Sequence, residues 1–90
     1  MFKVSVISNG NKVLGEIIVD SYFFDKTNYD YAYYFFNNNQ RVDFVRYSDS
    51  MRVQFCLKEM TGLFFIKLYI RDKRDGSKRT FNSEKLSIDS

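Results

Sequence analysis

Apolar and polar side chains alternate with a period of two over most of this chain. The clearest case is residues 51–58, whose odd-numbered positions are all apolar: Met51, Val53, Phe55 and Leu57. A helix would scatter these four side chains around its circumference, whereas a strand places them on one side. The pattern therefore predicts a β-strand with one buried face.

The same alternation predicts a second strand at residues 63–71, with four apolar side chains on one side: Phe64, Ile66, Leu68 and Ile70. Residues 59–62 are expected to turn the chain between the two strands, because Gly62 tolerates a positive φ. Asp75 and Gly76 mark a tight turn. Beyond this turn, residues 79–88 predict one polar strand at the edge of a sheet.

The first half of the chain predicts two hairpins. Residues 2–8 and 12–19 flank Asn9 and Gly10, a typical hairpin signal. Residues 29–36 predict a strand whose phase stays open, because aromatic residues fall on both sides. Residues 41–48 are its expected hairpin partner, and residues 21–28 fit either a strand or a loop.

These elements predict a single all-β domain over residues 1–90, an immunoglobulin/fibronectin-like antiparallel β-sandwich of about seven strands. The structural alternative is an OB-fold, whose helix between the third and fourth strands has no candidate segment here. Ninety residues with 19% aromatic content suffice for one dense core. The domain is also compatible with being one part of a longer protein.

Aromatic alternation around the hairpins carries a resemblance to a known family. The segments that carry it are residues 31–36, 37–42, 47–49 and 62–73. They resemble the triple-tyrosine family of bacterial sandwich modules, over roughly residues 29–83. The resemblance implies an accessory domain appended to a larger protein, such as a sensor protein or an enzyme that acts on polysaccharides.

Composition excludes several kinds of catalysis. The chain has no histidine, which excludes serine–histidine, cysteine–histidine and histidine–metal sites. Cys56 is the only cysteine and has no activating neighbour in its strand. The carboxylates are scattered over turns and strand ends, and no glycine-rich phosphate loop exists. We therefore expect a protein that is not an enzyme, with no catalytic residue, metal site or cofactor.

The sequence gives little information on localisation. Residues 1–10 lack the apolar segment of a signal peptide, and no apolar run has membrane-spanning length. The absence of an internal disulfide weakly favours a reducing compartment such as the cytoplasm. Localisation stays open on this evidence.

One sheet surface is the predicted binding site. If the apolar side of residues 63–71 faces the core, the other side faces outward beside the aromatic strand 29–36. The predicted contact face comprises Tyr34, Phe36, Phe65, Lys67, Tyr69 and Arg71. Its rings either cover one another and the stems of the cations, or contact a neighbouring domain, another copy or a sugar chain. Protein contact is preferred, because sugar platforms commonly use tryptophan and this chain has none.

A basic turn is the alternative site. It comprises Lys73, Arg74, Lys78 and Arg79. Two aspartates neutralise it in part, and the whole chain carries a net charge of +3, so these charges serve solubility or bind an anionic polymer. The expected function is a non-catalytic accessory module for protein or interdomain contact. Carbohydrate binding is the first alternative, and nucleic-acid binding at the basic turn ranks behind it.

Overall fold

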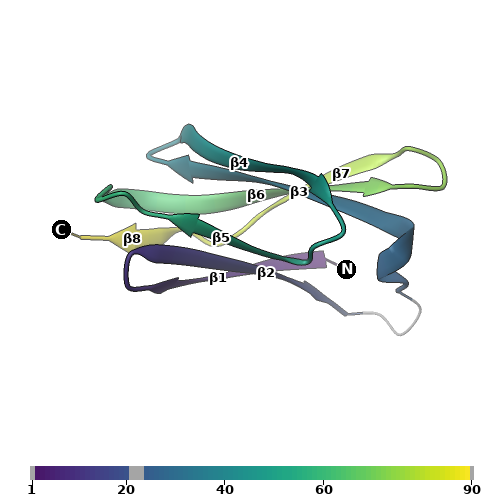
Figure 1. Ribbon diagram of the computed structural model, residues 1–90, viewed down its shortest axis with the longest axis horizontal. Helices are drawn as coiled ribbons and strands as arrows, with labels where there is room; N and C mark the ends of the chain where they lie inside the picture. The colour runs from purple at the N-terminus through teal and green to yellow at the C-terminus, as the bar shows by residue number, and fades with distance from the viewer. Residues whose placement is uncertain (1, 21–23, 90) are drawn as a thin grey trace.

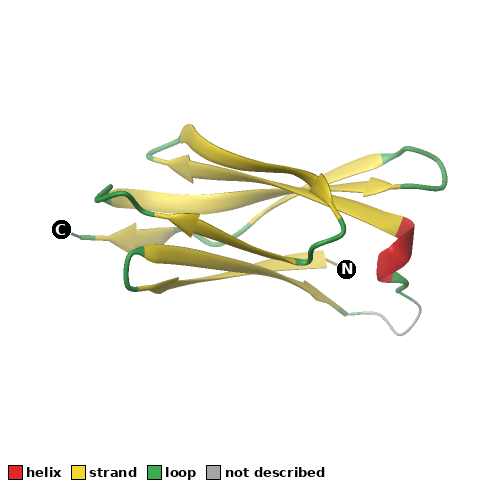
Figure 2. Ribbon diagram, in the orientation of Figure 1, coloured by secondary structure: helices red, strands yellow, loops and turns green. Residues whose placement is uncertain are grey.

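The computed structural model describes residues 2–20 and 24–89 of the chain. Within them lie eight strands: β1 (Phe2–Asn9), β2 (Lys12–Val19), β3 (Tyr29–Asn37), β4 (Gln40–Ser48), β5 (Arg52–Cys56), β6 (Gly62–Asp72), β7 (Lys78–Asn82) and β8 (Leu86–Ile88). One 3₁₀ turn, η1 (Lys26–Asn28), precedes β3 and is the only helical element in these two ranges (Figure 2). Of the segment left open at residues 21–28, positions 21–23 lie outside the described residues.

The strands form two antiparallel sheets that lie in two layers (Figure 1). The three-stranded sheet has the order β1-β2-β5. The five-stranded sheet has the order β4-β3-β6-β7, and β8 pairs with β6. Constant-type immunoglobulin domains likewise place the first, second and fifth strands in one sheet and the third, sixth and seventh in the other, but their fourth strand joins the first sheet, whereas β4 here pairs with β3. The predicted all-β antiparallel sandwich is confirmed.

The turns follow the backbone preferences of their residues. Asn38 and Asn39 both have positive φ, 50° and 66°, which is the conformation of a type I′ turn between β3 and β4. The turn between β5 and β6 begins earlier than predicted, because Lys58 and Glu59 already have φ of 51° and 64°. Gly62 has the positive φ expected of it, 110°.

The core lies between the sheets and is rich in aromatic rings. Its buried members are Val4, Val13, Ile17, Tyr31, Tyr33, Phe35, Val53, Phe55, Leu57, Phe64, Ile66, Leu68 and Ile70. The inward sides predicted for β5 and β6 are confirmed, although Met51 precedes β5 and is only partly buried. Phe35 of β3 stacks on Phe55 of β5 across the two layers, with centroids 4.7 Å apart. The phase of β3 is therefore settled with its odd positions inward.

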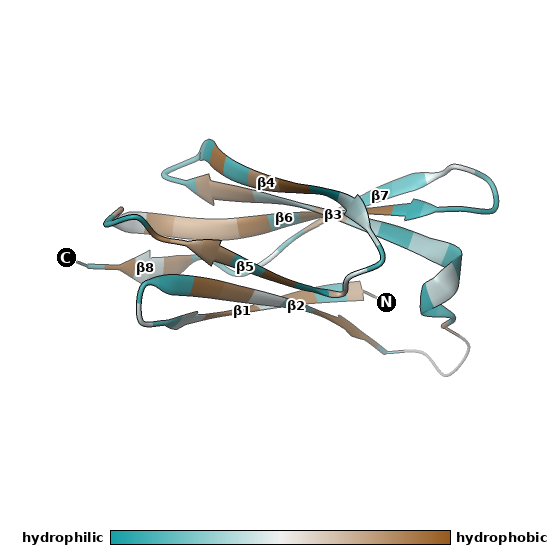
Figure 3. Cartoon of the chain, in the orientation of Figure 1, coloured by the Kyte–Doolittle hydropathy of each residue, from teal (hydrophilic) through white to brown (hydrophobic). Residues whose placement is uncertain are grey.

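The single edge strand predicted at residues 79–88 is wrong, because this segment forms the two short strands β7 and β8. Between them, the buried Ser83 continues the hydrogen bonding of β6. Its backbone N–H donates to the Ile66 carbonyl, and its Oγ accepts from the Ile66 N–H, both at 2.8 Å. The expected polar character of this edge is visible at β7, which is largely hydrophilic (Figure 3).

Two core tyrosines bind backbone carbonyls through their hydroxyls. Tyr33 Oη donates to the Ser50 carbonyl at 2.7 Å, and Tyr31 Oη donates to the Lys26 carbonyl at 3.3 Å. Burial raises the pKa of Tyr31 to about 12 and also raises the pKa of Tyr33. Because these folded-state pKa values lie above the ordinary value of 10.0, folding favours the neutral phenols.

This arrangement predicts alkaline unfolding. The stability that depends on the neutral phenols is complete below about pH 10 and is lost as the pH rises toward about 12. Tyr33→Phe should cost about 1 kcal/mol at neutral pH, because the Ser50 carbonyl loses its donor. The variant should also show a shallower loss of stability above about pH 10.

Urea denaturation measured at several pH values checks both effects, with the ultraviolet absorbance of phenolate as a second readout. A Tyr33→Phe variant whose alkaline stability falls as steeply as that of the wild type would contradict the assignment. Tyr34→Phe is the matched control, because the Tyr34 ring lies on the outer side of the same strand.

Candidate functional site

The outer side of the five-stranded sheet is the candidate site, and we call it the aromatic face. Residues directly opposite each other in an antiparallel pair lie on the same side of the sheet. The register places Phe36 opposite Phe65 and Tyr34 opposite Lys67. It places Ala32 opposite Tyr69, and Asp30 opposite Arg71. The six side chains of the predicted contact face therefore lie together on one surface.

Most rings of the aromatic face cover one another. Phe36 and Phe65 are stacked with centroids 4.8 Å apart and an interplanar angle of 1°. Tyr34 and Tyr69 also pack with centroids 4.8 Å apart. All four are half-buried. Phe44 of β4 differs, because 45% of it is exposed although its ring contacts Tyr34.

Cations lie over these rings. The pairs are Arg41 over Tyr34 at 4.9 Å, Lys67 over Tyr69 at 5.3 Å, Arg71 over Tyr47 at 4.3 Å and Lys85 over Phe65 at 6.0 Å. Cation–π attraction holds each positive group near its ring. It also leaves less of each ring surface free for a ligand that stacks.

A hollow of about 590 Å³ opens at the middle of the aromatic face. In β4, Arg46 and Tyr47 together lie opposite the single residue Ala32 of β3, because the register shifts there. Ala32 forms the floor of the hollow, and its small methyl side chain does not fill the space between the surrounding rings. The lining residues are Ala32, Tyr34, Phe44, Arg46, Tyr47, Tyr69 and Lys78.

The aromatic face is strongly positive. Its cations include Arg41, Arg46, Lys67, Arg71, Lys78 and Lys85, and among the strand residues that the register places on this side the one carboxylate is Asp30. Asp30 accepts a hydrogen bond from Arg71 Nη2 at 2.8 Å, which lowers the pKa of this carboxyl group. Over residues 2–20 and 24–89, neither Arg46 nor Lys78 has a carboxylate within ion-pair distance. The hollow therefore has two uncompensated cations at its margin.

The predicted basic turn does not form one surface. Lys78 and Arg79 are adjacent in β7 and face opposite sides of the sheet. Arg74 Nη2 lies 2.9 Å from Asp72 Oδ2, and its guanidinium also contacts Tyr29. Lys73 Nζ lies 3.6 Å from a carboxylate oxygen of Asp30. Of the four basic residues, only Lys78 lines the hollow of the aromatic face.

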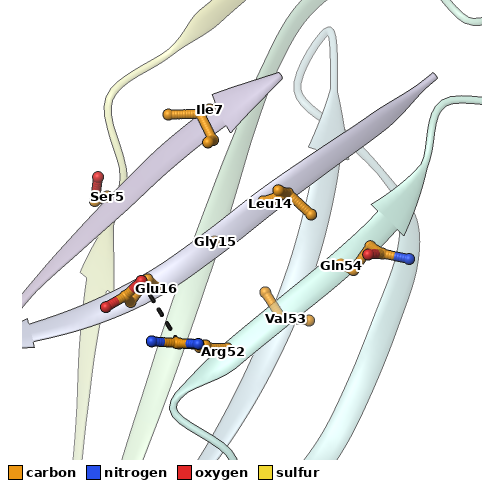
Figure 4. Close-up of a pocket in the computed structure, with 8 residues that line it drawn as sticks. All are labelled: Ser5, Ile7, Leu14, Gly15, Glu16, Arg52, Val53 and Gln54. Carbon is orange, nitrogen blue, oxygen red and sulfur yellow. Dashed lines mark ion pairs between the residues drawn. The ribbon is translucent and has the colours of Figure 1, made fainter. Parts of the chain in front are cut away.

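A second hollow, of about 470 Å³, lies on the three-stranded sheet (Figure 4). It is lined by Ser5, Ile7, Leu14, Gly15, Glu16, Arg52, Val53 and Gln54. Its two charged groups form an ion pair, with Arg52 Nε 3.6 Å from Glu16 Oε2. This hollow contains none of the predicted site residues and carries no uncompensated charge.

The described part of the chain offers no group of three histidine, cysteine, aspartate or glutamate side chains that would hold a metal ion. Cys56 is exposed. None of the helices in residues 2–20 and 24–89 is long and apolar enough to cross a membrane.

No family model, curated protein or solved structure matches this chain. The structure itself shows an all-β, two-sheet domain of 90 residues.

The sequence pattern did not predict the contribution of β4 to the aromatic face, which comprises Arg41, Phe44, Arg46 and Tyr47. The β3–β4 register shifts at two places, so simple alternation along β4 does not give the side on which each residue lies. The aromatic and basic content of residues 41–47 was the available signal.

Proposed function

We propose that this chain is a non-catalytic interaction module whose aromatic face contacts another protein or a neighbouring domain. The observation that carries the proposal is a sheet surface, opposite the core, that gathers two pairs of half-buried rings and the exposed ring of Phe44, which contacts Tyr34. Aromatic residues and arginine are enriched at protein interfaces, where packed rings supply contact area at low entropic cost. The resemblance to triple-tyrosine modules supports the same role, as an accessory domain of a larger bacterial protein.

The state of the rings favours protein over the two alternative partners. Nucleic acids and sugars bind to aromatic platforms by stacking on open ring surfaces. Here, cations lie over Tyr34 and Tyr69, and the rings of Phe36 and Phe65 face each other. A protein partner does not need an open ring surface, because it packs against ring edges and bonds with the cations.

Site-specific photo-crosslinking in the cells that produce the protein tests this proposal. A photoreactive phenylalanine derivative replaces Phe44, and in a matched variant it replaces Ile7, which is 56% exposed on the other sheet. We expect defined adducts from position 44 that protease removes and nuclease does not. We expect far fewer adducts from position 7.

The second variant in this experiment is Tyr69→Ala combined with the photoreactive group at position 44. It should lose the adducts while keeping its thermal midpoint within a few degrees of the parent, because Tyr69 lies outside the core. Adducts that nuclease or glycosidase removes, or equal adducts from positions 44 and 7, would overturn the proposal.

A further inference from the structure

We propose that the hollow over Ala32 receives an acidic side chain of the partner, held between Arg46 and Lys78. This inference rests on the proposed function and names the chemistry of the partner: a protein segment with exposed aspartate or glutamate. Arg46 comes from β4 and Lys78 from β7, and both line the same hollow. The site thus joins the two outer strands of the β4-β3-β6-β7 order.

Charge complementarity is the first argument for this occupant. The aromatic face carries at least six cations, and Asp30, the one carboxylate that the strand register places on it, is already bonded to Arg71. Arg46 and Lys78 have no such partner in the described part of the chain. An incoming carboxylate therefore gains charge-assisted bonds without displacing an existing ion pair.

The walls of the hollow are the second argument. Tyr34, Tyr47 and Tyr69 surround the alanine floor with apolar rings that carry hydroxyl groups. Rings at this site exclude water in part, which strengthens the attraction between the cations and an anion. The Tyr47 hydroxyl is protonated at neutral pH, as an ordinary tyrosine is, and can donate a hydrogen bond; burial raises its pKa further in the same direction.

The covered rings favour a protein carboxylate over a nucleic-acid phosphate. A single strand of nucleic acid combines phosphate contacts with bases that stack on rings. Arg41 lies over the ring of Tyr34 and also 5.3 Å from the ring of Phe44, so the most exposed ring is partly covered as well. A carboxylate needs only the cations and hydroxyls of the hollow.

Nuclear magnetic resonance titration of the whole chain tests the inference with defined probes. One peptide alternates glutamate with leucine, and its matched control carries glutamine in place of every glutamate. We expect the acidic peptide to shift the amide signals of Ala32 and Tyr69. The glutamine peptide should bind about tenfold more weakly, as expected for the loss of a hydrogen bond to a charged group.

Charge-removing variants of the protein assign the effect to the hollow. Arg46→Gln and Lys78→Gln should each lower the affinity for the acidic peptide several-fold, toward the affinity of the wild type for the glutamine peptide. Lys12→Gln is the matched control, because Lys12 is exposed on the three-stranded sheet. It should leave the affinity unchanged, apart from the small effect of net charge.

The remaining outcomes overturn one or both proposals. Equal binding of the two peptides on the aromatic face would overturn the acidic partner and leave the interaction module standing. If neither peptide binds, but single-stranded oligothymidylate or a polyuronate oligosaccharide does, both proposals are wrong. If Lys12→Gln loses as much affinity as Arg46→Gln, the site in the hollow is also overturned. Such a result would indicate that the peptide is attracted by the net charge alone.

Discussion

Replacing Phe55 with alanine should destabilise the fold by about 3–5 kcal/mol, because it leaves a large cavity between the sheets. Only 2% of Phe55 is exposed. Its ring stacks on Phe35 of the opposite sheet with an interplanar angle of 2°, so the loss removes a contact that joins the two layers. A loss of this size is a large share of the total free energy of unfolding of a small domain.

Urea or thermal denaturation of the purified protein measures this effect. Gln54→Ala is the matched control, because Gln54 precedes Phe55 in β5 and points to the outer side of the sheet. Its free energy of unfolding should stay within about 0.5 kcal/mol of the wild type. If the two variants unfold at the same denaturant concentration, the inward side of β5 has been assigned wrongly.

Gly15→Ala should destabilise by about 1–3 kcal/mol through overpacking. A β-carbon at this position would lie 2.6 Å from Cδ1 of Ile66 and 3.0 Å from Cγ1 of Val53. Ile66 is fully buried on the opposite sheet, so its side chain has little room to move away. The glycine in β2 is thus required by the close approach of the two sheets.

A double variant tests this explanation of Gly15. Ile66→Val removes the methyl group that the new β-carbon would meet, and alone it should cost about 0.5–1.5 kcal/mol. Combined with Gly15→Ala, it should give a loss smaller than the sum of the two single losses. Additive losses would show that the cost of alanine at position 15 comes from another cause.

The sequence was most informative where one side of a strand is apolar. In β6, the period of two identified Phe64 and Ile66 as core residues, and the structure buries both. In β3, alternation failed to give the phase, because Tyr33 and Tyr34 are equally aromatic. Which of the two faces the core is set by the pairing of β3 with distant strands, and the local sequence does not contain that information.

The candidate site was predicted in part for the same reason. The β6 members follow from alternation, and the β3 members follow only from the expected pairing of the two aromatic strands. The positions of Arg46 and Tyr47 depend on a register shift, and the separation of Lys78 from Arg79 depends on which side of β7 each residue faces. The interruption between β7 and β8 at Ser83 could not be predicted either, because there the serine hydroxyl, and not a strand, bonds to the backbone of β6.

The pairing of β3 with β6 has a consequence for folding during synthesis. Tyr29 pairs with Asp72 and Asn37 pairs with Phe64, so β3 gains this neighbour only after residue 72 has left the ribosome. Until then, the hairpin of β3 and β4 is available, and Tyr31 and Tyr33 lack most of their packing partners. Non-local pairing of this kind slows folding and delays it until the required strands are present. We therefore expect nascent chains that end before β6 to remain sensitive to protease, and protection to arise in one step once β6 has left the ribosome.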